Sequence, residues 1–115
     1  MPNLPVLVIG GGPAGLEASR GIADLGYNCI LVDKADFLGG NPIFADYSAI
    51  TPDMRNAEEA MDEMIAKVMV NPLVDVRLST TVKASTGEAP NLSVTLKNGK
   101  DGETVEVGSV VVATG

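Results

Sequence analysis

The chain has 115 residues, and its composition is 45% hydrophobic but only 3% aromatic, which predicts a single α/β domain with an aliphatic core. A formal net charge of −7 argues against nucleic acid or an anionic membrane surface as the partner. The chain has no histidine, the commonest general base and metal ligand, and its one cysteine, Cys29, excludes an internal disulfide or an iron–sulfur cluster held by this chain alone.

The first predicted strand, 6–9, runs into a glycine-rich turn. Gly10, Gly12 and Gly15 stand at G-x-G-x-x-G spacing, and a helix is predicted from Pro13 to Leu25. In this pattern the glycines permit a tight turn, close approach of a pyrophosphate, and close packing of the helix on the sheet. Free N–H groups at the helix start attract phosphate. The turn therefore predicts a dinucleotide site; the alternative is a glycine-rich turn in an unrelated αβ unit.

The helix is expected to pack Leu16, Ile22 and Leu25 against the sheet and to end at Gly26. The second strand is predicted at 28–32, and its continuous apolar character indicates a parallel strand covered on both faces.

The sequence also predicts the roles of two residues in or directly after this second strand, Cys29 and Asp33. Cys29 is interpreted as a small buried hydrophobe. Asp33 follows the strand, where a carboxylate accepts hydrogen bonds from a ribose hydroxyl and repels a 2′-phosphate.

The middle of the chain predicts a loop, a long helix and a third parallel strand. Gly39-Gly40 breaks the chain, 41–50 reads as a loop, and Thr51-Pro52-Asp53 is typical of a helix start. Apolar residues then recur at spacings of three and four: Met54, Ala57, Met61, Met64, Ile65 and Val68. We interpret them as core packing rather than a partner-binding surface. Asn71-Pro72 ends the helix, and 74–78 is the third strand.

The last third of the chain changes to short strands at 80–83, 92–96 and 104–107, within a meander of about 80–107. Turns are predicted at Thr86-Gly87 and across 98–102. A fourth parallel strand follows at 109–113. The predicted fold class is α/β: a Rossmann-like parallel sheet of order 3-2-1-4 with a three-stranded antiparallel β-meander as a crossover.

The meander crossover and the ending Ala113-Thr114-Gly115 resemble the FAD-binding domain of the two-dinucleotide-domain flavoproteins, the disulfide reductase superfamily. The resemblance spans the chain and is carried by 8–18, 32–34, 38–40 and 104–115. It implies that 1–115 form a partial FAD-binding domain, because the family continues into a nicotinamide domain and returns with a Gly-Asp segment that this sequence lacks.

The resemblance also implies which residues bind the cofactor. Those around the pyrophosphate are Gly10, Gly12, Pro13, Ala14 and Gly15. Asp33, where the family usually has glutamate, takes the adenosine ribose with Lys34 beside it, although Lys34 reads equally well as a solvated lysine. The remaining residues are Gly40 and Asn41 near the ribityl-pyrophosphate, the Val82 backbone at the adenine edge, and a second backbone stretch at Ala113, Thr114 and Gly115. No catalytic residue or metal ligand is predicted.

The residues after Gly39-Gly40 restrict the chemistry. The family's redox cysteine pair is replaced by 41–44, Asn-Pro-Ile-Phe, which excludes disulfide chemistry of that type. The stretch 39–76 is similar to the A subunit of heterodisulfide reductase and to related quinone-interacting flavoproteins, without their cysteine ligands.

The predicted function is the FAD-binding portion of a flavin-dependent oxidoreductase, which passes electrons between a nicotinamide or iron–sulfur/thiol donor and a redox partner. The alternatives are an NAD-binding domain of a dehydrogenase and a non-catalytic split fragment that docks to another subunit.

Expected partners are the remainder of a flavoprotein or other subunits of an electron-transfer complex. The sequence shows no signal peptide and no stretch long enough for membrane insertion, so a cytoplasmic location is expected. Strand 109–113 would form an apolar sheet edge, which predicts self-association.

Overall fold

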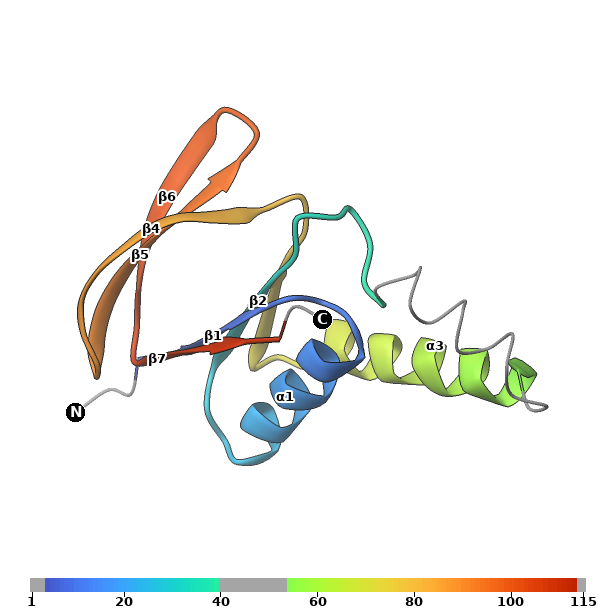
Figure 1. Cartoon of the computed structure of the whole chain (residues 1–115). Coiled ribbons are helices and arrows are strands. Elements are labelled where there is room, and N and C mark those ends of the chain that lie inside the picture. Colours follow the sequence, from blue (N-terminus) through green and yellow to red (C-terminus); the bar gives the residue numbers. More distant parts are fainter. Residues whose placement is uncertain (1–3, 40–53, 114–115) are drawn as a thin grey trace.

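The computed structural model describes residues 4–39 and 54–113. A parallel sheet of order β3-β2-β1-β7 forms its middle layer (Figure 1), made of β1 Val6–Ile9, β2 Cys29–Val32, β3 Val74–Arg77 and β7 Ser109–Val112. The antiparallel meander β4-β5-β6 is made of β4 Thr81–Glu88, β5 Asn91–Asn98 and β6 Asp101–Val107. The predicted sheet order and meander crossover are both confirmed.

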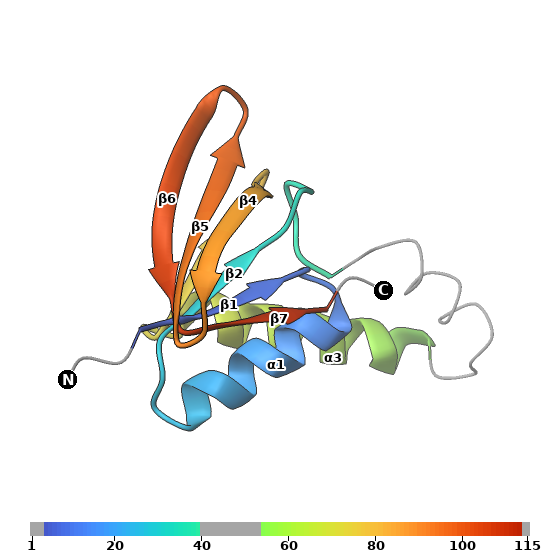
Figure 2. The same ribbon diagram turned by 60° about the vertical axis from the view of Figure 1, so that its left-hand side comes forward.

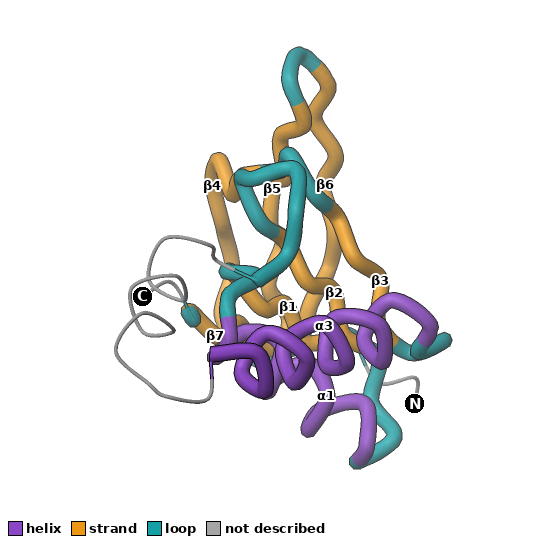
Figure 3. The backbone as a smooth tube through the Cα atoms, turned by 90° about the vertical axis from the view of Figure 1, so that its right-hand side faces the viewer, coloured by secondary structure: helices purple, strands orange, loops and turns teal. Residues whose placement is uncertain are grey.

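The helices α1, Pro13–Asp24, and α3, Met54–Val70, pack on one face of the parallel sheet. Figure 3 shows them side by side along that face, and Figure 2 shows the meander on the opposite side. One core cluster lies on the helix side of the sheet, where Val8, Leu16, Leu31 and Val68 are buried. Alternate residues of the same strands face the other way, as the period of a strand requires.

A second core cluster lies between the parallel sheet and the meander. Its buried members are Leu7, Ile30 and Val32 from the sheet, and Val94, Leu96 and Val107 from the meander. All four residues of β2 are buried, which confirms the prediction that this strand is covered on both faces.

The buried face of α1 differs from the prediction at one residue. Leu16 is fully buried and Ile22 packs against the helix-side core, but Leu25 is 76% exposed. The helix buries Ser19 and Ala23 instead. Because Leu25 follows Ala23 by two residues, or about 200° of rotation about the helix axis, it faces solvent. The helix ends as predicted, with Leu25 as its cap and Gly26 at φ +90°.

The first predicted turn of the meander is wrong. Thr86 and Gly87 lie inside β4, paired with Ser93 and Leu92, and the chain reverses at Ala89-Pro90. Gly87 is required by a close approach, because a Cβ there would lie 2.6 Å from the carbonyl oxygen of Asn91. The second turn is shorter than predicted, because only Gly99 and Lys100 lie between β5 and β6. Both strands are therefore longer than the predicted 92–96 and 104–107.

The described part of α3 confirms the prediction that its regularly spaced apolar residues pack in the core. Val68 is buried, and Met61, Met64 and Ile65 pack against the helix-side core. The side chains of Met54 and Ala57, the predicted loop 41–50 and the predicted helix start 51–53 lie outside the described residues. The predicted parallel strands agree with the observed ones to within one residue at each end.

Candidate functional site

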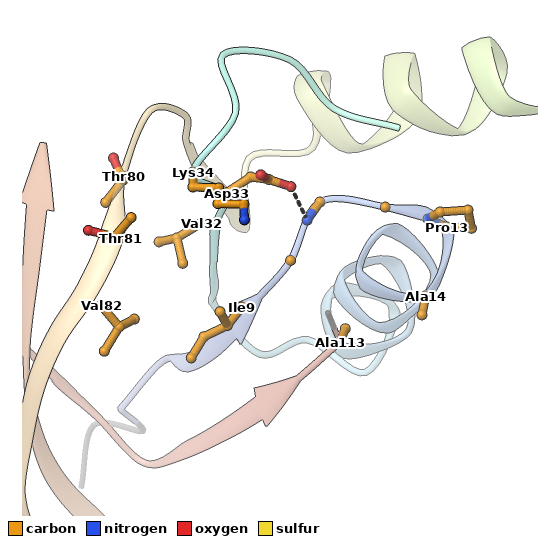
Figure 4. A pocket seen from close by; sticks show the side chains of 13 residues that line it. Ile9, Pro13, Ala14, Val32, Asp33, Lys34, Thr80, Thr81, Val82 and Ala113 are labelled. Atoms are coloured by element: carbon orange, nitrogen blue, oxygen red, sulfur yellow. Dashed lines mark hydrogen bonds between the residues drawn. The ribbon is translucent and has the colours of Figure 1, made fainter. Parts of the chain in front are cut away.

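A cleft of about 610 Å³ lies at the carboxyl ends of β1 and β2 (Figure 4). It lies between residues 10–12, called the glycine turn below, and the start of β4. Most of the residues predicted to bind a dinucleotide line it. These are Gly10, Gly12, Pro13, Ala14, Asp33, Lys34, Val82 and Ala113. Gly15 lies in the first turn of α1 behind them. The predicted site residues Gly40, Asn41, Thr114 and Gly115 lie outside the described residues.

The cleft is also lined by five residues that the sequence pattern did not single out: Ile9, Gly11, Val32, Thr80 and Thr81. Some signals for them were present in the sequence. Ile9 and Val32 end the two strands that lead into the site, and Thr80-Thr81 directly precedes Val82. Gly11 completes an unbroken run of three glycines.

The glycine turn requires glycine for two separate physical reasons. Gly10 has φ +115°, in the region that side chains disfavour, and its N–H donates to the Val32 carbonyl at 2.8 Å. At Gly15 a Cβ would lie 1.6 Å from the carbonyl oxygen of Gly10. Helix α1 therefore starts in direct contact with the turn.

The first turn of α1, beside the cleft, has backbone donors without intrahelical partners. Gly12 is the N-cap residue, no side chain caps the helix, and Pro13 occupies its first turn. The first intrahelical bond runs from the Leu16 N–H to the Gly12 carbonyl at 2.9 Å. The amides of Ala14 and Gly15 thus have no intrahelical acceptor, and an anion suits them because the positive end of the helix dipole lies there.

Asp33 connects β2 to the glycine turn. Its Oδ2 accepts a hydrogen bond from the Gly11 N–H at 2.6 Å, drawn as a dashed line in Figure 4, and its Oδ1 accepts one from the Ala35 N–H at 2.9 Å. Asp33 is partly buried, whereas Lys34 beside it is exposed. The carboxylate thus lies in the cleft, next to the turn.

The chain at the start of β4 forms the opposite wall of the cleft and is hydrogen-bonded to the segment that follows β2. The Thr80 N–H donates to the Asp33 carbonyl at 2.9 Å, and the Ser79 N–H donates to the Ala35 carbonyl at 2.8 Å. Thr80 is only 4% exposed, and its hydroxyl donates to the Leu78 carbonyl at 2.8 Å. The start of β4 is therefore fixed relative to Asp33.

Comparison with known proteins identifies the family. The family model described as pyridine nucleotide-disulphide oxidoreductase matches residues 4–115. The chain belongs to this family. Its fold is that of the Rossmann-like FAD-binding domain, and the family consists of FAD-dependent oxidoreductases.

Relatives agree with this assignment. The chain is 30% identical over 95 residues to the A subunit of the ferredoxin:CoB-CoM heterodisulfide reductase of Methanosarcina acetivorans, a match that covers 79% of this chain and 12% of that protein. A heterodisulfide reductase A-subunit-like protein of Archaeoglobus profundus is 32% identical over 92 residues, covering 80% of this chain and 13% of that protein. The chain thus spans about an eighth of the length of these relatives. The predicted resemblance to the superfamily is confirmed, and so is a distant homology to the A subunit of heterodisulfide reductase.

A solved structure supports the fold. The L-proline dehydrogenase of P. horikoshii superimposes with a TM-score of 0.78 at 23% identity, over 99% of this chain and 23% of that one. At this identity the match is evidence of a common architecture.

The disulphide oxidoreductase family is named for thiol chemistry, yet the cysteine of this chain does not lie in the cleft. Cys29 is 1% exposed in the helix-side core, with its Sγ 3.5 Å from the Ser19 Oγ. Burial raises the pKa of the Cys29 thiol, and the hydrogen bond to Ser19 offsets part of that rise. The prediction of a buried cysteine is confirmed, and the only titratable groups among the described residues lining the cleft are Asp33 and Lys34.

The described residues offer neither a metal site nor a membrane span. Within 4–39 and 54–113, no group of three or more Cys, Asp and Glu side chains is arranged to hold a metal ion. No helix in that part of the chain is long and apolar enough to cross a membrane.

Proposed function

We propose that the cleft binds FAD through its adenosine diphosphate half, and that the chain is the FAD-binding portion of a flavin-dependent oxidoreductase. One observation carries the proposal: the glycine turn, the Asp33 carboxylate and the start of β4 line a single cleft at the carboxyl ends of β1 and β2. Ligands of open α/β sheets bind at such strand ends. The 610 Å³ of the cleft is also within the usual range for a cofactor pocket.

The chemistry of the lining residues fits an adenosine diphosphate. The open N–H groups of Ala14 and Gly15 would hold the pyrophosphate, and the remaining lone pairs of Asp33 would accept ribose hydroxyls. Ile9, Val32 and Val82 supply an apolar wall for the adenine ring (Figure 4). The net charge of −7 gives no general attraction for phosphate, so these local backbone donors must do the holding.

Bound flavin would supply the redox chemistry, and the protein's part is to bind and orient it. We propose that electrons pass between a nicotinamide or iron–sulfur/thiol donor and a redox partner. This rests on the homology to the A subunit of heterodisulfide reductase, of which the chain spans about an eighth. The donor and acceptor sites are accordingly proposed to belong to the remainder of a flavoprotein or to other subunits, in the cytoplasm.

The test is binding of FAD to the purified chain. FAD added to the purified chain is expected to lose fluorescence on binding and to raise the melting temperature more than the same concentration of NADH. A protein that ignores FAD but is stabilised by NADH would instead be an NAD-binding domain. ADP should compete with FAD, since both ligands share the adenosine diphosphate half.

A further inference from the structure

The segment that follows β2 holds both backbone groups of Gly11 in the centre of the glycine turn. The Gly11 N–H donates to Asp33 Oδ2 at 2.6 Å, and the Gly11 carbonyl accepts a hydrogen bond from the Gly39 N–H at 2.7 Å. A Cβ on Gly11 would lie 2.7 Å from Leu38 Cδ2 and 2.9 Å from Asp33 Oδ2. The turn and the segment 33–39 therefore fit together with no room for a side chain between them.

Asp33 is itself fixed from several directions. Its Oδ1 accepts the Ala35 N–H at 2.9 Å, its own N–H donates to the Arg77 carbonyl at 3.1 Å, and its carbonyl accepts the Thr80 N–H at 2.9 Å. These bonds tie the residue to the end of β3 and the start of β4. Its carboxylate is thus a rigid acceptor and not a free side chain that happens to touch the turn.

We propose that Asp33 is a positioning residue, whose carboxylate fixes Gly11 and so sets the shape of the phosphate-binding turn before any ligand arrives. The proposal rests on the proposed function for the identity of the ligand, but the contact itself is made by the protein alone. Each carboxylate oxygen accepts one amide and keeps a second acceptor position, so Asp33 can also bind a ribose. The Gly11 N–H is committed to Asp33, which leaves phosphate to the amides of the first turn of α1.

Positioning and simple electrostatics predict opposite effects on a phosphate ligand. Asp33→Asn removes a negative charge beside an anion site, which by Coulomb's law alone favours anion binding. The amide group, however, offers one acceptor oxygen, and its NH₂ group then faces either the Gly11 or the Ala35 N–H, both donors. If Asp33 fixes the turn, Asp33→Asn weakens phosphate binding although it makes the site less negative.

The experiment uses inorganic pyrophosphate, a probe that has no ribose and cannot report a ribose contact. Asp33→Asn is expected to bind it about tenfold more weakly than the unmodified chain, the effect of losing one charge-assisted hydrogen bond. The matched control is Asp36→Asn, which removes the same charge from an exposed residue of the same segment. It should bind pyrophosphate as tightly as the unmodified chain or more tightly. Equal or tighter binding by Asp33→Asn would overturn the proposal.

A second variant separates shape from charge. Gly11→Ala keeps the Asp33 carboxylate but places a methyl group where Leu38 and Asp33 now lie. It should also weaken pyrophosphate binding. Chemical-shift spectra of each variant establish that it is folded before its affinity is compared, and unchanged affinity in folded Gly11→Ala counts against the proposal.

A third measurement needs no ligand and distinguishes failure of this proposal from failure of the proposed function. Hydrogen exchange at the Gly11 amide of the free protein should be slow, and about tenfold faster in Asp33→Asn, whereas Asp36→Asn leaves it unchanged. If neither FAD nor pyrophosphate binds, the proposed function fails, and the exchange rates still decide whether Asp33 fixes the turn. Equal Gly11 exchange in the unmodified chain and in Asp33→Asn would show that it does not.

Discussion

At the scale of single residues, α1 contains two glycines whose surroundings are opposite. Gly15 lies in the first turn of the helix, against the glycine turn, and a Cβ there would lie 1.6 Å from the Gly10 carbonyl oxygen. Gly21 lies in the last turn of the same helix, and a Cβ there would meet nothing within 4 Å. One glycine is required by packing, and the other only lowers the helix propensity.

Substituting each glycine with alanine should therefore change stability in opposite directions. Gly15→Ala is expected to lose about 2–3 kcal/mol of unfolding free energy, because backbone atoms must shift to admit the methyl group. Gly21→Ala should gain about 0.5–1 kcal/mol from the lower entropy of its unfolded chain. Urea unfolding measures both, and a Gly15→Ala variant as stable as Gly21→Ala would contradict the close contact at the turn.

Cys29 gives a pH dependence of stability. Burial raises the pKa of its thiol in the folded protein, so above the unfolded pKa the unfolded state loses this proton while the folded state keeps it. The contribution of Cys29 to stability is therefore complete at neutral pH and falls as pH rises from about 8.5 toward the folded pKa.

Cys29→Ala provides the test of that pH dependence. Other groups titrate in the same range, so the quantity to compare is the difference in unfolding free energy between the two proteins at pH 7 and at pH 10. The stability that the thiol adds over alanine should shrink as pH rises. A difference that stays constant over this range would mean that the thiol ionises equally in both states.

At the candidate site, the sequence predicted the residues whose position and backbone constraint follow from the local path of the chain. Gly10 and Gly15 could be predicted because a fixed spacing encodes a strand, a turn and a helix start, and Asp33 because it directly follows the next strand. Gly11 was missed because its constraint comes from Asp33, Leu38 and Gly39, which only the fold brings against it. Contacts between segments distant in sequence leave no periodic signal.

At the scale of elements, an ion-pair cluster joins β3 to the meander beyond the edge of the apolar core. The Arg77 guanidinium at the end of β3 pairs with Glu103 of β6 and, at 3.0 Å, with Asp75 of its own strand. The adjacent Glu103 carboxylate, more than Asp75, raises the pKa of Arg77. The cluster therefore links the end of β3 to β6 in addition to the hydrophobic contacts of Val105 and Val107.

Neutralising Glu103 should have a small, salt-dependent effect. The pair is partly exposed, so Glu103→Gln is expected to cost at most about 1 kcal/mol of unfolding free energy, and less as salt is added. Glu106→Gln is the matched control, because Glu106 is exposed on the same strand and points to its other face. Equal losses in the two variants, or a Glu103→Gln loss that ignores salt, would show that the cluster contributes nothing specific.

The meander also contains a turn that was predicted wrongly from the sequence. Gly87 resembles a turn residue but lies in β4, paired with Leu92; glycine is needed there because its φ is positive and a Cβ would lie against the carbonyl oxygen of Asn91. Turn composition signals that the chain departs from a regular strand. It does not distinguish a reversal from a local distortion, and the pairing partner decides between them.

At the scale of the whole molecule, the two edges of the parallel sheet differ in charge. The β3 edge carries Asp75 and Arg77, and charged side chains on an edge strand oppose pairing with other chains. The β7 edge, Ser109–Val112, carries no charge, and its Val111 and Val112 are 37% and 69% exposed. Within the described residues no strand pairs with the outer side of β7. Self-association through β7, predicted from the sequence, therefore stays the prediction to test.

The 115-residue chain made alone should have an average mass in sedimentation experiments that rises with protein concentration. Val112→Lys should abolish that rise, because a lysine on an edge strand opposes pairing. The matched control is Val70→Lys, since Val70 is 79% exposed but ends α3, just before β3 at the opposite edge of the sheet from β7. Both substitutions reduce the net charge of −7 equally, so general repulsion cannot separate them. If Val70→Lys also became monomeric, the contact would lie elsewhere, and a monomeric unmodified chain at every concentration would refute self-association.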